Sequence, residues 1–387
     1  MTQSGFGTAT RAAAAVCCTL ALAGCSTLSS MLPSFFGPEK PKPAELPPNA
    51  ALISVRPSWM ARVGQVSLPL SVAVNGTTVA VASNDGSVAA IDAATGRDLW
   101  RANVKSPLAA GVGSDGKLTA VVTSANELVA LSGGAEAWRQ KLPAAAYTAP
   151  FVAGGRVFLL SADRSVSAFD GQTGRRLWTQ QRPGEPLVLR QSGVMLAVGD
   201  TLVVGLSGRM VGLNPANGSV RWEAPVATAR GINDVERLVD LVGSVSRVGD
   251  VVCARAFQAA VGCVDASRGS VLWTRPANGA EGVHGDERNM FGTESDGRVQ
   301  AWRRENGERA WVNELLRYRG LTAPLVLGRS VIVGDSTGLV HFLSREDGSL
   351  LTRMATDGSP IAAAPVVAGN TLVVVTRNGG IYGFVPD

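Results

Sequence analysis

The residues that could carry chemistry in this chain are few and widely spaced. The chain has 387 residues but only two His and five Cys, and metal or acid–base centres depend heavily on these residue types. His284 and His341 lie far apart, in neither a His-x-His nor a His-Glu-x-x-His motif. Residues 111–116 resemble a dinucleotide loop in their glycines, but they join two predicted strands instead of opening a helix. We therefore predict no catalytic residue, metal site or cofactor, and no enzymatic activity.

The overall charge does not indicate a nucleic-acid partner. The 36 Lys and Arg exceed the 31 Asp and Glu, for a formal net charge of +5. The excess is spread along the chain, whereas nucleic-acid-binding surfaces gather it in one place. With 45 glycines and only 17% charged residues, the composition favours short buried strands joined by tight turns.

The N-terminal sequence predicts a cleaved lipoprotein signal peptide over residues 1–24. Arg11 precedes an apolar stretch that is too short to span a bilayer and ends in small residues, as secretory signals do. The tetrapeptide Leu-Ala-Gly-Cys at 22–25 resembles the bacterial lipobox, which implies that Cys25 becomes the first residue and is acylated. The alternative is an ordinary signal peptide that contains a Cys by chance. Because Ser26 and not Asp follows the Cys, the resemblance implies a lipid anchor in the outer membrane, with the folded part in the periplasm.

Residues 25–54 are predicted to form the lipidated Cys and a Pro-rich tether. Six of the chain's 20 prolines lie within residues 31–50, which show no apolar periodicity. This composition favours extended, polyproline-like conformations, so we expect the segment not to pack. The folded domain is then expected to cover residues 55–387.

A repeat organises the predicted domain. In its first copy a hydrophobic strand leads to Asp92, Gly96 follows four residues later and Trp100 four residues after that. Later copies pair Gly134 with Trp138, Gly174 with Trp178, Gly218 with Trp222, Gly269 with Trp273 and Gly307 with Trp311; Gly348 keeps its place, but Thr352 replaces the Trp. These positions lie 38 to 51 residues apart, the length of a four-stranded propeller blade. The Gly supplies the positive φ of a hairpin, and the Trp row is expected to pack between blades rather than to stack on a ligand.

Both ends of the domain contribute to an eighth copy. Residues 378–384 begin a copy that stops before any Trp, while Trp59 lies upstream with no repeat ahead of it. We expect the strand around Trp59 to pair with the C-terminal strand, so that the ring closes without an open sheet edge. The predicted fold class is all-β: an eight-bladed β-propeller with one blade shared by the two ends.

Two cysteines remain in the predicted domain, because Cys17 and Cys18 leave with the signal peptide and Cys25 carries lipid. Cys253 and Cys263 fall near opposite one another across a strand pair when the repeats are aligned. Two interpretations stay open, a cross-strand disulfide and a pair of small buried thiols. We favour the disulfide, because the predicted destination is oxidising.

The Asp-x-x-x-Gly-x-x-x-Trp repeat resembles that of the PQQ-dependent quinoprotein dehydrogenases, which are eight-bladed propellers. Those enzymes hold a quinone above a calcium ion, beside a vicinal Cys pair. The adjacent cysteines of this chain, Cys17 and Cys18, lie in the predicted signal peptide, and no cluster of calcium-binding oxygens stands out. A quinoprotein dehydrogenase is therefore kept only as an alternative.

Two copies of the repeat are longer than the others. The spacing is 44 residues from Trp178 to Trp222 and 51 from Trp222 to Trp273. The first excess contains Pro-Leu-Val-Leu-Arg at 186–190, and the second is the segment 231–241. Leu and Val mixed with Arg and Asp, on loops held by a rigid ring, are typical of a protein-contact patch with apolar anchors. The alternative is a pair of merely longer loops.

With these insertions, residues 12–387 resemble the BamB family, lipoproteins of the outer-membrane β-barrel assembly (BAM) machinery. In that family two segments bind the periplasmic POTRA domains of BamA. The resemblance assigns Leu187, Leu189 and Arg190 to the first segment, and Glu236, Arg237, Leu238 and Asp240 to the second, with Val242 where the family has a further Asp.

The resemblance implies a non-catalytic scaffold that supports the assembly and insertion of β-barrel proteins into the outer membrane. Arg190 and Asp240 are candidates for charged contacts with BamA. Unfolded outer-membrane proteins are a further partner that the family's role allows. A lipoprotein propeller that binds another envelope partner remains an alternative.

Overall fold

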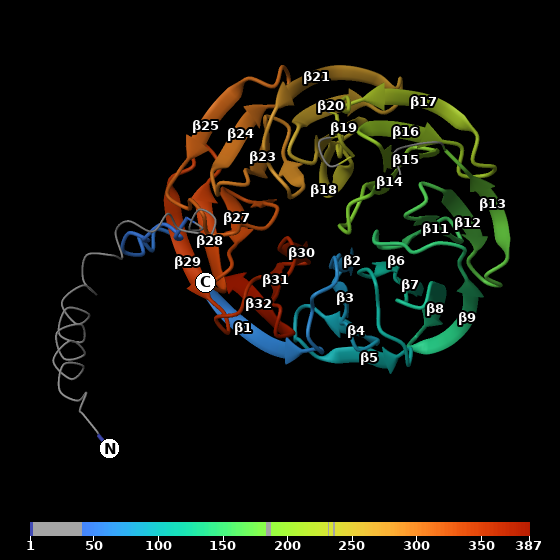
Figure 1. Cartoon of the computed structure of the whole chain (residues 1–387), viewed down its shortest axis with the longest axis horizontal. Helices are drawn as coiled ribbons and strands as arrows, with labels where there is room; N and C mark the ends of the chain where they lie inside the picture. The colour runs from blue at the N-terminus through green and yellow to red at the C-terminus, as the bar shows by residue number, and fades with distance from the viewer. Residues whose placement is uncertain (3–40, 183–186, 231, 235–236) are drawn as a thin grey trace. The chain divides into compact units, whose positions relative to one another are not determined.

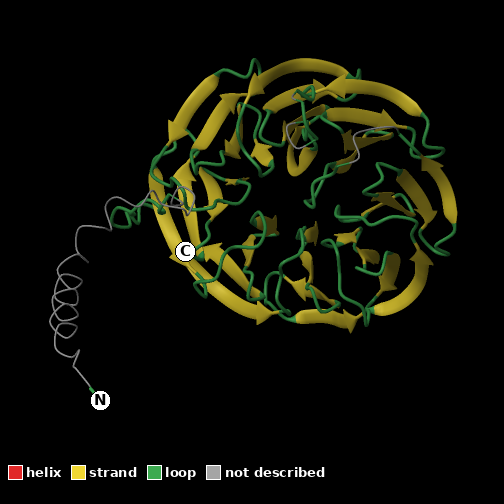
Figure 2. Ribbon diagram, viewed as in Figure 1, coloured by secondary structure: helices red, strands yellow, loops and turns green. Residues whose placement is uncertain are grey.

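The protein is described here by a computed structural model that covers residues 1–2, 41–182, 187–230, 232–234 and 237–387. The chain divides into two units, Met1–Lys42 and Pro43–Asp387, and the second contains the strands. In the described residues, 32 strands form eight four-stranded antiparallel sheets arranged as blades around an axis (Figures 1 and 2). The predicted eight-bladed β-propeller is confirmed. Within the described residues there is no helix long and apolar enough to cross a membrane.

The first four blades follow one another along the chain, and each runs from an inner to an outer strand. Blade 1 contains β2 (Ala73–Asn75), β3 (Thr78–Ala82), β4 (Ser87–Asp92) and β5 (Asp98–Asn103). Blade 2 contains β6 (Gly113–Ser114), β7 (Leu118–Val122), β8 (Glu127–Ser132) and β9 (Ala135–Lys141). Blade 3 contains β10 (Phe151–Ala153), β11 (Arg156–Leu160), β12 (Val166–Asp170) and β13 (Arg176–Gln180). Blade 4 contains β14 (Met195–Val198), β15 (Thr201–Leu206), β16 (Arg209–Leu213) and β17 (Val220–Pro225).

The remaining blades complete the ring. Blade 5 contains β18 (Leu241–Val248), β19 (Val251–Ala256), β20 (Ala260–Asp265) and β21 (Ser270–Pro276). Blade 6 contains β22 (Val283–Gly285), β23 (Asn289–Thr293), β24 (Val299–Arg303) and β25 (Arg309–Asn313). Blade 7 contains β26 (Leu325–Leu327), β27 (Ser330–Gly334), β28 (Leu339–Ser344) and β29 (Leu350–Ala355). Blade 8 contains β30 (Val366–Ala368), β31 (Thr371–Val375), β32 (Gly380–Pro386) and, from the other end of the domain, β1 (Val55–Arg62).

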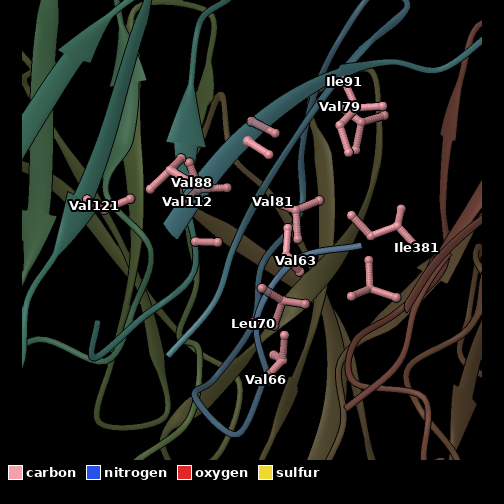
Figure 3. Packing of buried hydrophobic residues seen from close by; sticks show 14 of the residues in the cluster. Val63, Val66, Leu70, Val79, Val81, Val88, Ile91, Val112, Val121 and Ile381 are labelled. Carbon is pink, nitrogen blue, oxygen red and sulfur yellow. The ribbon is translucent and has the colours of Figure 1, made fainter. Parts of the chain in front are cut away.

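The middle strands of each blade are apolar on both sides because neighbouring blades cover both faces of the sheet. In blade 1, β3 and β4 are almost entirely buried, whereas the outer strand β5 is largely exposed. Figure 3 shows part of the resulting core, in which Val79, Val81 and Ile91 of blade 1 lie near Ile381 of blade 8. Continuous Val, Ile and Ala runs, rather than strict alternation, follow from this double burial.

The repeated Trp residues join each blade to the next. Trp138 of blade 2 lies over Gly174 of blade 3, whose positive φ of 71° shapes the hairpin. Its Nε1 donates a hydrogen bond to the Gly171 carbonyl oxygen at 2.8 Å. The same bond links Trp59 to Ala93, Trp178 to Pro215, Trp273 to Arg304 and Trp311 to Arg345. The Trp row is therefore a structural joint between blades.

The two ends of the domain close the ring as expected. Strand β1 pairs antiparallel with β32, and Trp59 stands opposite Gly383. Trp59 then packs over Gly96 of blade 1, so blade 8 is joined to blade 1 in the same way as the others.

Blade 7 lacks the Trp for a physical reason. A repeat Trp needs the hairpin between the two outer strands of the next blade, but in blade 8 those strands are β32 and β1, which no hairpin joins. Thr352 stands opposite Phe342, whereas in the other blades a small residue lies opposite the Trp. In blade 7 the large residue, Phe342, is on the third strand and the small one, Thr352, is on the outer strand, the reverse of the other blades. The buried ring of Phe342 fills the space at this joint.

The second half of the Pro-rich segment packs, contrary to our expectation. The Leu52 amide donates to the Leu351 carbonyl at 2.7 Å, and the Asn49 side chain bonds both the amide and the carbonyl of Arg353. Arg353 also donates to the Pro47 carbonyl at 2.9 Å. Pro-rich composition sets the local conformation of a segment, but backbone and side-chain bonds to β29 decide its docking.

A buried ion cluster fixes the start of this docked segment. Arg319 donates to the Ala44 carbonyl at 2.9 Å and to Asp335 Oδ2 at 2.8 Å, and His341 Nε2 lies 2.9 Å from the same oxygen. Burial alone would raise the pKa of Asp335, but hydrogen bonds from His341, the Leu339 amide and Arg319 hold it well below its usual range. His341 is thus a core residue that supports an ion pair.

Cys253 and Cys263 are bonded as a disulfide across β19 and β20, where they stand directly opposite each other. Both residues are completely buried, and Cys263 also lies opposite Trp273. The bridge therefore sits in the central part of blade 5.

Candidate functional site

The two insertions open on the same face of the ring. Because strands alternate in direction, the turn between the second and third strands of a blade and the connection to the next blade leave at the same end. The first insertion connects β13 to β14 and the second connects β17 to β18. They flank blade 4, so both lie on one sector of this face, together with the β11–β12 turn of blade 3.

Arg164, in the β11–β12 turn, connects the two insertions. Its Nη1 donates to Asp240 Oδ1 of the second insertion at 2.8 Å, and its Nη2 donates to the Leu187 carbonyl of the first at 2.9 Å. The Leu189 amide donates to Asp240 Oδ2 at 3.2 Å. A guanidinium and a carboxylate therefore bring segments about 50 residues apart into one structure.

The first insertion presents an apolar and a cationic side chain to solvent. Leu187 is 39% exposed and Leu189 is half-buried. Arg190 is exposed, and its guanidinium carbon lies 5.7 Å from the centroid of the Tyr147 ring, a cation–π geometry that limits where the charge points. The first insertion thus exposes an apolar side chain, Leu187, and a cationic one, Arg190, which lies over the Tyr147 ring.

Hydrogen bonds to neighbouring blades also hold the first insertion in place. Gln191 Nε2 donates to the Ala280 carbonyl at 2.6 Å, and the Gly193 amide donates to Thr148 Oγ1 at 2.9 Å. These bonds reach across to blades 3 and 6, so the patch rests on a rigid base.

The second insertion contributes less to the exposed surface than its sequence suggests. Asp240 is mostly buried in its ion pair with Arg164, and Leu238 is half-buried. Arg237 is exposed, and its amide donates to the Asn233 carbonyl at 3.2 Å. Glu236 lies outside the described residues. The structure thus brings Leu187, Leu189 and Arg190 of the first insertion together with Asp240 of the second. Arg237 also lies on the second insertion.

Val242, which stands where the resembling family has a further Asp, is buried. It belongs to β18, where it pairs with Arg255 and forms an isolated bridge with Gly193. A side chain at this position supports the insertion and does not reach the exposed patch.

Arg164 and Tyr147 are the residues of this site that the sequence argument missed. Arg164 could have been found by aligning the turns between the second and third strands, because it replaces the Gly found in blade 1. Tyr147 lies outside both insertions, and nothing in its sequence context marks it.

A cavity of about 610 Å³ lies on the axis, where the innermost segments of several blades line it. Arg190, Glu281 and Arg377 are its charged lining residues. Burial raises the pKa of Glu281, while Arg255 and Arg377 act in the opposite direction. Within the described ranges, no group of three or more His, Cys, Asp or Glu could hold a metal ion.

The fold and this surface define an eight-bladed propeller with quinoprotein-type repeats, in which two enlarged connections on one face are bonded to each other through Arg164 and Asp240. A family model described as outer membrane protein assembly factor BamB matches residues 84–313. The protein of that name from Burkholderia pseudomallei is 41% identical over 339 residues, 87% of this chain and 89% of that protein. The one from Bordetella pertussis is 38% identical over 385 residues, 98% of each. The crystal structure of BamB from Moraxella catarrhalis has the same fold, with a TM-score of 0.78 at 23% identity over 86% of this chain and 99% of that one.

The chain therefore belongs to the BamB family of outer membrane protein assembly factors. This decides between the two resemblances of the repeat: the chain is an assembly factor and not a quinoprotein dehydrogenase or another enzyme.

Proposed function

We propose that this chain is a non-catalytic scaffold of the BAM complex that binds the POTRA domains of BamA through the surface formed by its two insertions. The family assignment supports a role in outer-membrane protein assembly, at the periplasmic side of that membrane. The observation that carries the partner proposal is the joining of both insertions by Arg164 and Asp240 into one patch.

The chemistry of the patch suits a folded protein partner. Leu187 offers an exposed apolar side chain as an anchor, and Arg190, three residues further along the same insertion, offers a charge that lies over the Tyr147 ring. Protein interfaces gain most from a few such anchors on a rigid base, and Arg is prominent among them. Arg190 is therefore the residue that we expect to make a charged contact with an acidic group of the POTRA domains.

The lipid anchor at Cys25 is part of the same proposal. Cys25 lies outside the described residues, so its support is the lipobox-like sequence alone. Acylation there would hold the propeller at the outer membrane, where its partner is embedded.

The proposal is tested by titrating the full chain, in detergent, with a soluble fragment that contains the POTRA domains of BamA. Arg190→Glu should weaken binding at least tenfold, about 1.4 kcal/mol or more, because it places like charges together. Arg268→Glu is the matched control: Arg268 has an 81% exposed side chain in a hairpin on the opposite face, and its variant should bind normally.

Failure of the unaltered chain to bind the fragment would refute the partner assignment. Equal binding by Arg190→Glu and the unaltered chain would place the contact elsewhere on the propeller.

A further inference from the structure

Arg164 occupies a backbone conformation that long side chains rarely adopt. Its φ is +63°, in the left-handed region. In the equivalent turns of blades 1, 2, 6, 7 and 8 the same position is held by Gly86, Asn126, Gly297, Gly338 and Gly379. The amide of each of these residues donates a hydrogen bond to the carbonyl oxygen three residues earlier, as the Arg164 amide does to the Ser161 carbonyl at 3.0 Å. Arg164 thus holds, at a strained φ, a position that these five blades fill with Gly or Asn.

The side chain accounts for that strain. Backbone strain persists where the surroundings determine it, and it often marks a functional residue. The Arg164 side chain is 9% exposed, and its two terminal nitrogens bond a carboxylate of one insertion and a carbonyl of the other. A Gly or Asn in this turn could reach neither group.

Only a planar, forked cation fits this arrangement. The two acceptors belong to different segments, and a guanidinium presents two N–H groups in fixed directions, whereas an ammonium is a single point of charge. Asp240 extends the link, because its second oxygen accepts the Leu189 amide. The chain of bonds therefore runs from the blade 3 turn through the second insertion to the residue beside Arg190.

We propose that Arg164 is the positioning residue of the partner-binding surface: it joins the two insertions before the partner arrives and so presents Leu187 and Arg190 in one arrangement. The inference rests on the proposed function. Arg164 itself is buried and does not touch the partner. Asp240 acts in the same way, through its ion pair. Ordering the surface in advance removes a cost that binding would otherwise have to overcome.

The test uses the full chain in detergent and the POTRA fragment as the probe. Arg164→Gly restores the residue that sister turns contain at this φ, so it removes the side chain while the turn keeps its conformation. We expect the variant to stay folded at the temperature of the assay and to lose at least tenfold in affinity. Arg164→Lys can donate to one of the two acceptors, so its affinity should lie between that of the unaltered chain and that of Arg164→Gly. Asn126→Gly introduces Gly at the equivalent position of the blade 2 turn. It is the matched control and should bind with normal affinity.

Hydrogen exchange at the Leu189 amide gives a readout that does not depend on the partner. Arg164→Gly and Asp240→Asn should both speed its exchange, while Asn126→Gly should not. Full affinity together with a protected Leu189 amide in Arg164→Gly would overturn the inference. So would a loss of affinity that only follows a lowered thermal midpoint. If the unaltered chain does not bind the fragment, the proposed function fails, and the exchange experiment still decides whether Arg164 orders the insertions.

Discussion

The joint between blades 2 and 3 makes a quantitative prediction about how the ring is held together. In Trp138→Phe an aromatic ring still fills the joint, but the indole nitrogen that bonds the Gly171 carbonyl at 2.8 Å is lost. Trp138 is 8% exposed, so water cannot easily replace that bond.

Two terms set the expected loss of stability. Leaving a buried carbonyl without its donor costs about 1–2 kcal/mol. The smaller ring buries on the order of 40 Å² less apolar surface, which at 25 cal/mol per Å² adds about 1 kcal/mol. The free energy of unfolding should therefore fall by about 2–3 kcal/mol.

Trp100→Phe separates the two terms. Trp100 packs on Gly134, in the shortened hairpin of blade 2, and within the described part of the chain its indole makes no hydrogen bond to that blade. Its substitution should cost only the area term, about 1 kcal/mol.

The assay is urea unfolding followed by circular dichroism, with the slope m required to match that of the unaltered chain. Equal losses for Trp138→Phe and Trp100→Phe would show that the indole bond contributes nothing. The account of the repeated Trp as a hydrogen-bonded joint would then be wrong.

Two further predictions concern buried groups. Breaking the Cys253–Cys263 disulfide, which closes a loop with a sequence separation of 10, should lower the free energy of unfolding by about 3 kcal/mol. Urea unfolding with and without reductant measures this loss. If reductant changes the stability of the unaltered chain no more than that of a variant with both cysteines replaced by Ala, the prediction is wrong. The pKa of Asp335 is lowered in the folded state, so its stabilising contribution is present above its unfolded pKa and is lost as pH falls below about 4. Acid unfolding should therefore be steeper for the unaltered chain than for Asp335→Asn, and parallel curves would show that the Arg319 and His341 contacts do not hold the carboxylate ionised.

The architecture could be predicted because each blade repeats the same local solution. Gly96 and Trp100 recur at fixed spacing, and a row of such pairs has few arrangements other than a ring. The place of Trp59 followed from counting, since a closed ring needs one more outer strand than the repeats provide.

The details that could not be predicted depend on contacts between distant segments. Composition indicated an unpacked Pro-rich segment, but bonds from Asn49 and Leu52 to β29 dock its second half. Asp240 was predicted to contact a partner, yet its carboxylate is paired within the chain to Arg164, 76 residues away. No local pattern predicts such a pairing, because it depends on how the β11–β12 turn of blade 3 meets the second insertion.

The central claim, that the two insertions contact BamA, is tested most directly in the intact outer membrane. A photoreactive amino acid at Leu187 should crosslink this chain to BamA on illumination, because that side chain lies in the exposed patch. The same photoreactive amino acid at Leu99 is the control, because Leu99 is 55% exposed on the outer strand of blade 1. It should not crosslink to BamA. Crosslinking to BamA from position 187 alone is the predicted result; crosslinking from position 99 alone, or from neither position, would contradict the account.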